Sequence, residues 1–256
     1  MTVSSPLPNA PQAPRSGGGL GPLVGMFRLL LNHQLTRGRL VLAATMSGLA
    51  VLLAVLLSRE TFDPNQQTIE NFSVFGLGLM VPILSLVLAS SSMGQLVEDE
   101  TLVYLWIRPN QRWMLAMAAW LASASVAVPL TVLPLTLAAA IGSKGNGTTT
   151  MAMALSVALA SVAYTAVFTL IGLILRRSLI WGLVYVFIWE FFVARVGQGA
   201  ARLSINTYAT SVLAKLTDVE LPLAERSLFY GVTTPIVVSI VAVGLTAWRL
   251  GRTNVA

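Results

Sequence analysis

The side chains best suited to binding chemistry gather in residues 95–112, a charged segment between two long apolar runs. Three consecutive acids at positions 98–100 lie a few helical turns before Arg108 and Arg112. Carboxylates and guanidinium groups form strong, charge-assisted hydrogen bonds with oppositely charged partners. Apolar side chains are interleaved with these charges, so the segment can lie at a membrane surface and still offer polar groups. The pattern predicts a docking helix.

Glu190 is the second candidate, because it is the only acidic residue inside the membrane spans predicted below. An ionisable group in hydrocarbon is costly, and it is usually paired, turned toward a cavity, or functional. Two interpretations remain open. Glu190 either lines a path through the membrane, or it lies near the surface and pairs with Arg195, five positions later.

Enzymatic chemistry is not expected from the other residues. Cysteine is absent, which excludes disulfides, thiolate metal sites and thiol catalysis. The single histidine, His33, precedes the first predicted span, so we expect neither a serine–histidine pair nor a metal cluster in the membrane. A phosphate-binding loop needs its glycines and lysine in a fixed order, and residues 142–148 hold them in another order. We expect no catalytic residue, no metal site and no cofactor bound by this chain.

Composition indicates a membrane protein. Of the 256 residues, 55% are hydrophobic and 10% are charged, and the mean hydropathy is +0.77, far from the averages of soluble domains. A transmembrane helix needs about 20 apolar residues to cross roughly 30 Å of hydrocarbon. Six apolar segments are the candidates and predict an all-α, polytopic fold: residues 40–57, 72–93, 114–141, 151–175, 179–194 and 228–248.

Two of these spans have unusual lengths. Residues 114–141 exceed the need, so this span should tilt or kink, with Pro129 and Pro134 as the places. Residues 179–194 are short, and the long outer loop 195–227 follows them, which predicts re-entrant or interfacial structure. Apolar residues at near-helical spacing in this loop predict a short interfacial helix that caps the exit: Leu203, Tyr208, Val212, Leu213 and Leu216.

Serine residues in the second and third spans have two interpretations. Either they pack transmembrane helices together, as serine commonly does, or they line a path through the membrane. We favour the packing interpretation. The residues are Ser85, Ser90, Ser91, Ser92, Ser123 and Ser125.

The distribution of basic residues predicts the orientation, because Lys and Arg accumulate in short cytoplasmic loops. With the N-terminus inside, the inner segments hold three acids, whereas the outer segments balance their charges. We expect an integral protein of the plasma (inner) membrane with both termini cytoplasmic, and a positive inner face that meets anionic lipid rather than nucleic acid. Ten of the sixteen basic residues fall inside: Arg15, Arg28, Arg37, Arg39, Arg108, Arg112, Arg176, Arg177, Arg249 and Arg252.

The N-terminal region divides into two parts. Residues 1–21, rich in proline and glycine, predict a flexible tail. Residues 23–39 show an amphipathic pattern that predicts an interfacial helix; the alternative is a snorkelling extension of the first span. Residues 22–248 form one six-helix domain in this scheme, and residues 249–256 a short tail. The anchoring residues are Phe27, Arg28, Arg37 and Arg39.

Residues 99–112, D-E-T-L-V-Y-L-W-I-R-P-N-Q-R, resemble the D-G-T-(I/L)-x-Y-L-L-x-R-P-x-x-R signature of type 2 exporter permeases in the ATP-binding cassette (ABC) family. The plan is similar too: an interfacial N-terminal helix, six spans, and a long outer loop between the fifth and sixth. Glu100 stands where those permeases usually have glycine, and Ala118 and Ala119 replace a pair that often ends in lysine. The matching residues are Thr101, Leu102, Tyr104, Leu105, Arg108, Pro109 and Arg112.

The resemblance implies that residues 95–112 form a cytoplasmic coupling helix, docked on a separate ATPase subunit that holds ATP and Mg²⁺. It also implies a second permease, identical or related, and export of a hydrophobic or amphipathic compound. The implied ATPase-coupling residues are Gln95, Glu98, Asp99, Glu100, Thr101, Tyr104, Arg108, Pro109 and Arg112. Since the second and fifth spans line the path in similar permeases, the implied path residues are Met80, Pro82, Trp181, Tyr185, Trp189 and Glu190.

Two other classes of protein remain open. A secondary carrier would usually show more intramembrane charge and an internal repeat, and residues 40–141 and 151–248 show no convincing repeat. A membrane scaffold or assembly factor that transports nothing is the other alternative.

Overall fold

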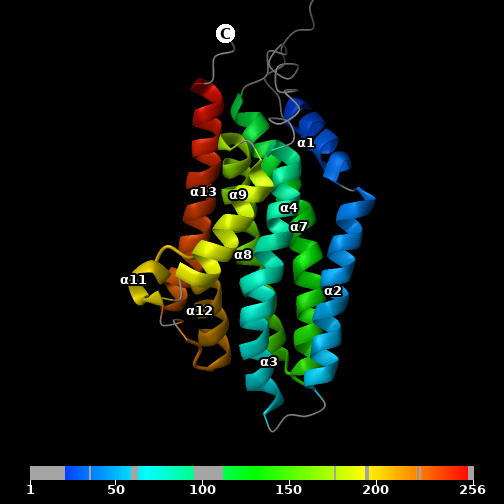
Figure 1. The fold of residues 1–256 in the computed structure, drawn as a ribbon, viewed down its shortest axis with the longest axis vertical. Helices are drawn as coiled ribbons and strands as arrows, with labels where there is room; N and C mark the ends of the chain where they lie inside the picture. Colours follow the sequence, from blue (N-terminus) through cyan, green and yellow to red (C-terminus); the bar gives the residue numbers. More distant parts are fainter. Residues whose placement is uncertain are drawn as a thin grey trace, which may run out of the picture.

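The computed structural model describes residues 21–34, 36–58, 63–94, 112–175, 177–193, 196–222, 224 and 226–252. Within these ranges the chain is helical, and none of the residues forms a β-strand. Figure 1 shows a bundle of long helices with shorter ones along one side. In chain order the elements are α1 (Gly21–Gln34), α2 (Arg37–Leu57), α3 (Pro64–Phe72), η1 (Ser73–Met80), α4 (Val81–Ala89), η2 (Ser90–Gly94), α7 (Arg112–Gly142), α8 (Gly147–Ile174), α9 (Ser178–Val184), η3 (Tyr185–Val193), α11 (Gln198–Ala201), α12 (Ile205–Thr217) and α13 (Leu228–Arg252).

Five helical segments of the described residues are long and apolar enough to cross a membrane, which indicates an integral membrane protein. They overlap the predicted first, second, third, fourth and sixth spans, and the C-terminal ends of the first four agree with the predicted ones to within one residue. The third, α7, is one helix with Pro129 and Pro134 inside it. The five segments are Arg37–Leu56, Pro64–Ser92, Trp113–Gly142, Gly147–Ile174 and Leu228–Arg252.

The second span is a continuous helix that widens locally. Its central part, η1, is π-helical, and the Val81 N–H reaches the Gly76 carbonyl, five residues back. Pro82 follows and has no N–H to donate, so it cannot continue an ordinary ladder of hydrogen bonds. Short π-helical stretches inside α-helices often occur at functional sites.

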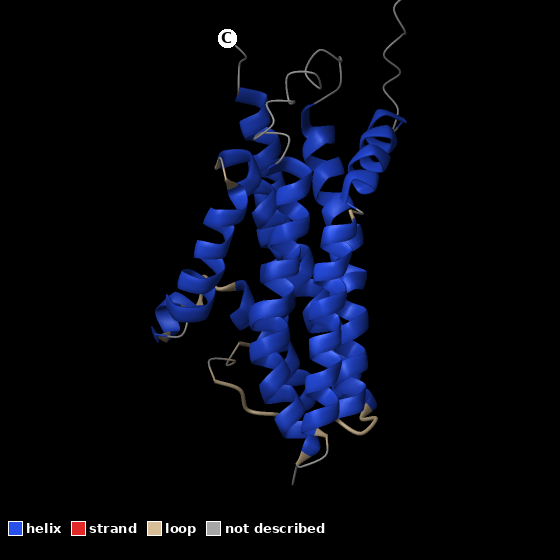
Figure 2. Ribbon diagram, turned by 45° about the vertical axis from the view of Figure 1, so that its right-hand side comes forward, coloured by secondary structure: helices blue, strands red, loops and turns tan. Residues whose placement is uncertain are grey.

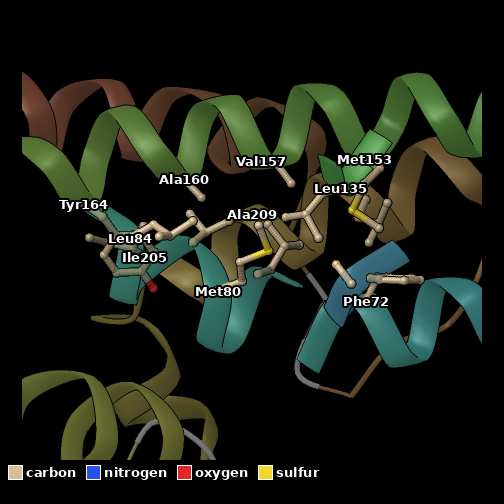
Figure 3. Packing of buried hydrophobic residues seen from close by; sticks show 14 of the residues in the cluster. Phe72, Met80, Leu84, Leu135, Met153, Val157, Ala160, Tyr164, Ile205 and Ala209 are labelled. Atoms are coloured by element: carbon tan, nitrogen blue, oxygen red, sulfur yellow. The ribbon is translucent and has the colours of Figure 1, made fainter. Parts of the chain in front are cut away.

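The bundle is built around α8, which packs against α4, α7, α12 and α13. Tyr164 and Phe168 of α8 are fully buried, and their rings stack with centroids 5.8 Å apart. Figure 3 shows Leu84 and Ile205 near Tyr164, with Phe72, Leu135 and Met153 at the other end of the same cluster. In the most apolar stretch of the second span 72% of the residues are buried, so this span is central. In α2 the share is 17%, so α2 lies at the edge of the bundle.

The predicted fifth span is too short to count among the five long segments. α9 and η3 cover it as a short apolar helix, and Figure 2 shows this arm leaving the bundle at an angle. The described part of residues 195–227 contains α11 and α12. Val212 and Leu213 of α12 are fully buried, and α12 packs against α8 and α13. A helix therefore forms where the spacing predicted one, although its role at the exit stays a prediction.

Two glycines allow these short helices to approach the bundle. A Cβ atom on Gly182 of α9 would lie 2.1 Å from Leu86 Cδ1 of α4, and one on Gly231 of α13 would lie 2.7 Å from Val212 Cγ2 of α12. Small residues at such contacts let helices pack closely in lipid, where van der Waals contact drives association.

One end of the bundle gathers arginine and tryptophan side chains. Figure 1 shows α1, the start of α7 and the end of α13 at the end where the C-terminus lies. Trp113 and Trp248 are exposed there, and the Arg252 guanidinium lies 4.2 Å from the centroid of the Trp248 ring. Tryptophan is enriched at membrane–water interfaces, so this end has the composition expected of a membrane surface. These three helix ends carry arginines of the predicted inner segments: Arg28 in α1, Arg112 at the start of α7, and Arg249 and Arg252 at the end of α13.

Candidate functional site

The predicted coupling residues lie outside the described part of the chain, with one exception. Arg112 is the first residue of α7. The other coupling predictions, Gln95, Glu98, Asp99, Glu100, Thr101, Tyr104, Arg108 and Pro109, stay predictions. The structure does describe the two helix ends on either side of this segment, η2 and the start of α7.

These flanking helices are joined by hydrogen bonds between buried side chains. Ser92 Oγ of η2 and Ser123 Oγ of α7 lie 2.8 Å apart. Gln34, the last residue of α1, is 1% exposed, and its amide lies 3.1 Å from Ser123 Oγ. With the amide turned over, it also donates to the Ala122 carbonyl at 3.2 Å and accepts from the Ser123 N–H at 3.3 Å. We call Gln34, Ser92 and Ser123 the polar clamp.

The apolar face of α1 packs against the bundle next to the polar clamp. Leu30 is buried in a cluster with Leu115 and Ala119 of α7, and Phe27 packs against that cluster. Arg28 is exposed on the other face, and α1 ends at Gln34, before α2 starts at Arg37. The predicted faces of the amphipathic helix are therefore present, and α1 is a separate helix rather than a continuous extension of the first span. Its position at a membrane interface stays a prediction.

The predicted path residues occupy different environments. Met80 and Pro82 are buried in the bundle, whereas Trp181 is 53% exposed and Trp189 is half-buried. Of the six residues, Tyr185 and Glu190 are joined by a hydrogen bond, from the Tyr185 hydroxyl to Glu190 Oε1 at 3.1 Å. Their role in a path stays a prediction.

Glu190 is held by groups from the following part of the chain. Its carboxylate is 2% exposed. Oε1 also accepts from the Ile205 N–H at 3.0 Å, and Oε2 accepts from Ser204 Oγ at 2.5 Å. The Tyr164 hydroxyl of α8 also faces this carboxylate but does not reach hydrogen-bonding geometry. Arg195, the other partner proposed from the sequence, lies outside the described residues.

The carboxylate of Glu190 thus sits at the N-terminus of α12. Ser204 is the N-cap of that helix, and its Oγ accepts from the Thr207 N–H at 3.2 Å. The first N–H groups of a helix lack partners within the helix and carry a partial positive charge. A carboxylate placed there satisfies both the hydrogen bonds and the charge.

The sequence patterns did not single out Ser204, Ile205 or Tyr164 as neighbours of Glu190. A signal for the first was present, because a serine directly before an apolar-periodic run is a typical N-cap. No local signal pairs that cap with a glutamate fourteen residues earlier. Tyr164 is brought to the site by packing of α8.

No protein-family model matches the chain, and no curated protein is significantly similar to it.

Proposed function

We propose that this chain is the membrane-spanning permease subunit of an ATP-driven exporter of the ABC type. The observation that supports this most is the placing of the polar clamp. It joins three elements at the arginine-rich end of the bundle: α1, and the helices on either side of the segment that resembles the exporter signature.

The proposed mechanism needs a mechanical connection of this kind. Closure of two ATPase subunits has to move transmembrane helices, so a surface element must pass force to the second and third spans. Coupling between distant sites travels through packed side chains and hydrogen bonds that join rigid elements. Ser92 and Ser123 lie in the spans before and after residues 95–112, and their hydrogen bond makes these two spans respond together.

The remaining parts of the proposal follow from the resemblance. ATP and Mg²⁺ bind to the partner ATPase, and a second permease, identical or related, completes the membrane part. The cargo is a hydrophobic or amphipathic compound, and both termini are cytoplasmic in the plasma (inner) membrane. Six crossings are part of this proposal, with the short arm of α9 and η3 contributing to the fifth.

A secondary carrier is the weaker candidate. Such carriers usually bind coupling ions through intramembrane charges near the middle of the bilayer. In the described helices, the one acid with this position, Glu190, already accepts three hydrogen bonds from the protein. If the chain is a scaffold without transport activity, no ATP-linked transport is expected. The experiment described next therefore separates a scaffold from an exporter.

The test is co-purification of the chain with an ATPase subunit, sought first among the products of neighbouring reading frames, followed by reconstitution in lipid. Alanine variants of Glu98, Asp99 and Arg108 should each lower ATPase association and substrate-stimulated ATP hydrolysis at least fivefold. Lys215→Ala and Glu220→Ala are the controls, because both residues are exposed charges in the segment 195–227. An absence of ATPase association, or unchanged ATP-linked transport in all three variants, would contradict the proposal.

A further inference from the structure

Two short helical elements occupy successive depths of the bundle beside α8. α9 packs against α4 and η2, which belong to the half of the second span nearer the arginine-rich end. α12 packs against η1, in the other half of the same span. Figure 3 shows Ile205 at the start of α12 near Tyr164 and Leu84, and Ala209 beside Met80, one turn further along. α9 therefore ends near the depth at which α12 begins, and η3, which follows α9, contacts η1 as α12 does.

Glu190 lies at the junction of these two elements. Its carboxylate comes from η3, and the Ile205 N–H and Ser204 hydroxyl that it accepts from belong to the first turn of α12 and its cap. The described residues that bond to this carboxylate are all donors, and the third is the Tyr185 hydroxyl, one turn back on η3. These three donors suit a carboxylate, which only accepts hydrogen bonds.

We propose that α9, η3 and α12 together form one composite membrane crossing, and that Glu190 is the positioning residue that seats α12 at mid-depth. Within the hydrocarbon each backbone N–H needs a partner from the protein, because water is absent there. A helix that starts at mid-depth exposes its first N–H groups to this requirement. The Glu190 carboxylate accepts from the Ile205 N–H, and Ser204 Oγ accepts from the Thr207 N–H. With these groups paired, α12 can start inside the bundle and stay against α8. The proposal does not depend on the exporter function.

The proposal predicts a specific effect of Glu190→Gln. An amide keeps the size of the side chain but carries no charge and has one accepting oxygen. In one orientation the Ile205 N–H loses its acceptor, and in the other the Ser204 hydroxyl has to accept from the amide instead of donating to a carboxylate. α12 should then leave its place on α8. Ser204→Asp in the same chain should restore it, because this change returns a carboxylate to the N-terminus of α12 and lets the amide at position 190 donate to it.

Cysteine labelling can measure the position of α12, because the natural chain contains no cysteine. Ala209→Cys places a probe on α12, and Ala116→Cys places a control probe on α7; both alanines are fully buried. The single-cysteine proteins are placed in lipid nanodiscs, where both membrane faces are accessible, and treated with a charged, water-soluble maleimide. Both probes should react slowly in the parent chain.

With Glu190→Gln, the probe at position 209 should react at least tenfold faster, with no change at position 116. Added Ser204→Asp should return the rate to within about threefold of the parent. Unchanged labelling at position 209 with Glu190→Gln, or no recovery with Ser204→Asp, would overturn the proposal. If both probes react faster with Glu190→Gln, the variant Tyr185→Phe decides, because it removes one donor to the Glu190 carboxylate. Faster labelling at position 209 alone would then support the proposal. Unchanged labelling at that position would overturn it.

Discussion

Ser92 Oγ and Ser123 Oγ lie 2.8 Å apart, across the contact between the second and third long helices. Both side chains are buried, and Ser123 Oγ also bonds to the Ala119 carbonyl of its own helix at 2.9 Å. The pair therefore connects two helices whose ends flank the segment that resembles the exporter signature.

Ser92→Ala should lower the stability of the bundle by about 0.6 kcal/mol, and by no more than about 1.7 kcal/mol, the average and the maximum found for hydrogen bonds between transmembrane helices. Thermal unfolding in detergent measures this. Ser125→Ala is the matched control, because Ser125 is exposed and bonds only to the Ala122 carbonyl of its own helix among the contacts described. An equal loss in the two variants would mean that the contact between helices contributes nothing.

Gly182→Ala should destabilise the packing of α9 on α4. The new methyl group would overlap Leu86, and overpacking of this kind typically costs about 1–3 kcal/mol. Gly244→Ala in α13 is the control, since no neighbouring side chain lies within 4 Å of the position that its added methyl group would take. Unfolding measurements on Gly182→Ala with Leu86→Ala should show partial recovery; if the double variant is as unstable as the sum of its single variants, the steric explanation is wrong.

Leu30→Ala should loosen α1, because Leu30 is 3% exposed and packs among residues of α7. Removal of a buried leucine side chain typically costs about 2–5 kcal/mol. Leu29→Ala provides the comparison, since its neighbour Leu29 is 62% exposed. Limited proteolysis at the junction of α1 and α2 should be faster in the first variant alone; equal rates would place both side chains in lipid or solvent.

Asn146→Ala should weaken the start of α8. The Asn146 side chain accepts from the N–H groups of Thr148 and Thr149 at 3.0 and 3.3 Å, and loss of an N-cap typically costs about 0.5–2 kcal/mol. Asn146→Asp keeps the acceptor and adds a negative charge at the helix N-terminus, so its stability should equal or exceed that of the parent. Chemical unfolding monitored by circular dichroism compares the three proteins, and a stable alanine variant would contradict the capping role.

Five of the six predicted spans correspond to long helices because hydropathy is a local property that adds along the chain. The fifth was the weak point already in the sequence, with 16 residues where about 20 are needed. Ser92 and Ser123, predicted to pack helices together, do so through a shared hydrogen bond. The coupling segment stays a prediction because residues 95–111 lie outside the described structure.

The amino-acid sequence by itself determined that this is a helical membrane protein and where its long helices run. These properties depend on runs of neighbouring side chains and on the low polarity of the bilayer. The tertiary structure alone decided what Glu190 does. Its partners come from Tyr185, five residues earlier, and from Ser204 and Ile205, and only packing against α8 brings the start of α12 to this carboxylate. The same packing decided that α9 ends near the depth at which α12 begins, because a helix end inside the bundle is stable only where other elements supply its missing hydrogen bonds.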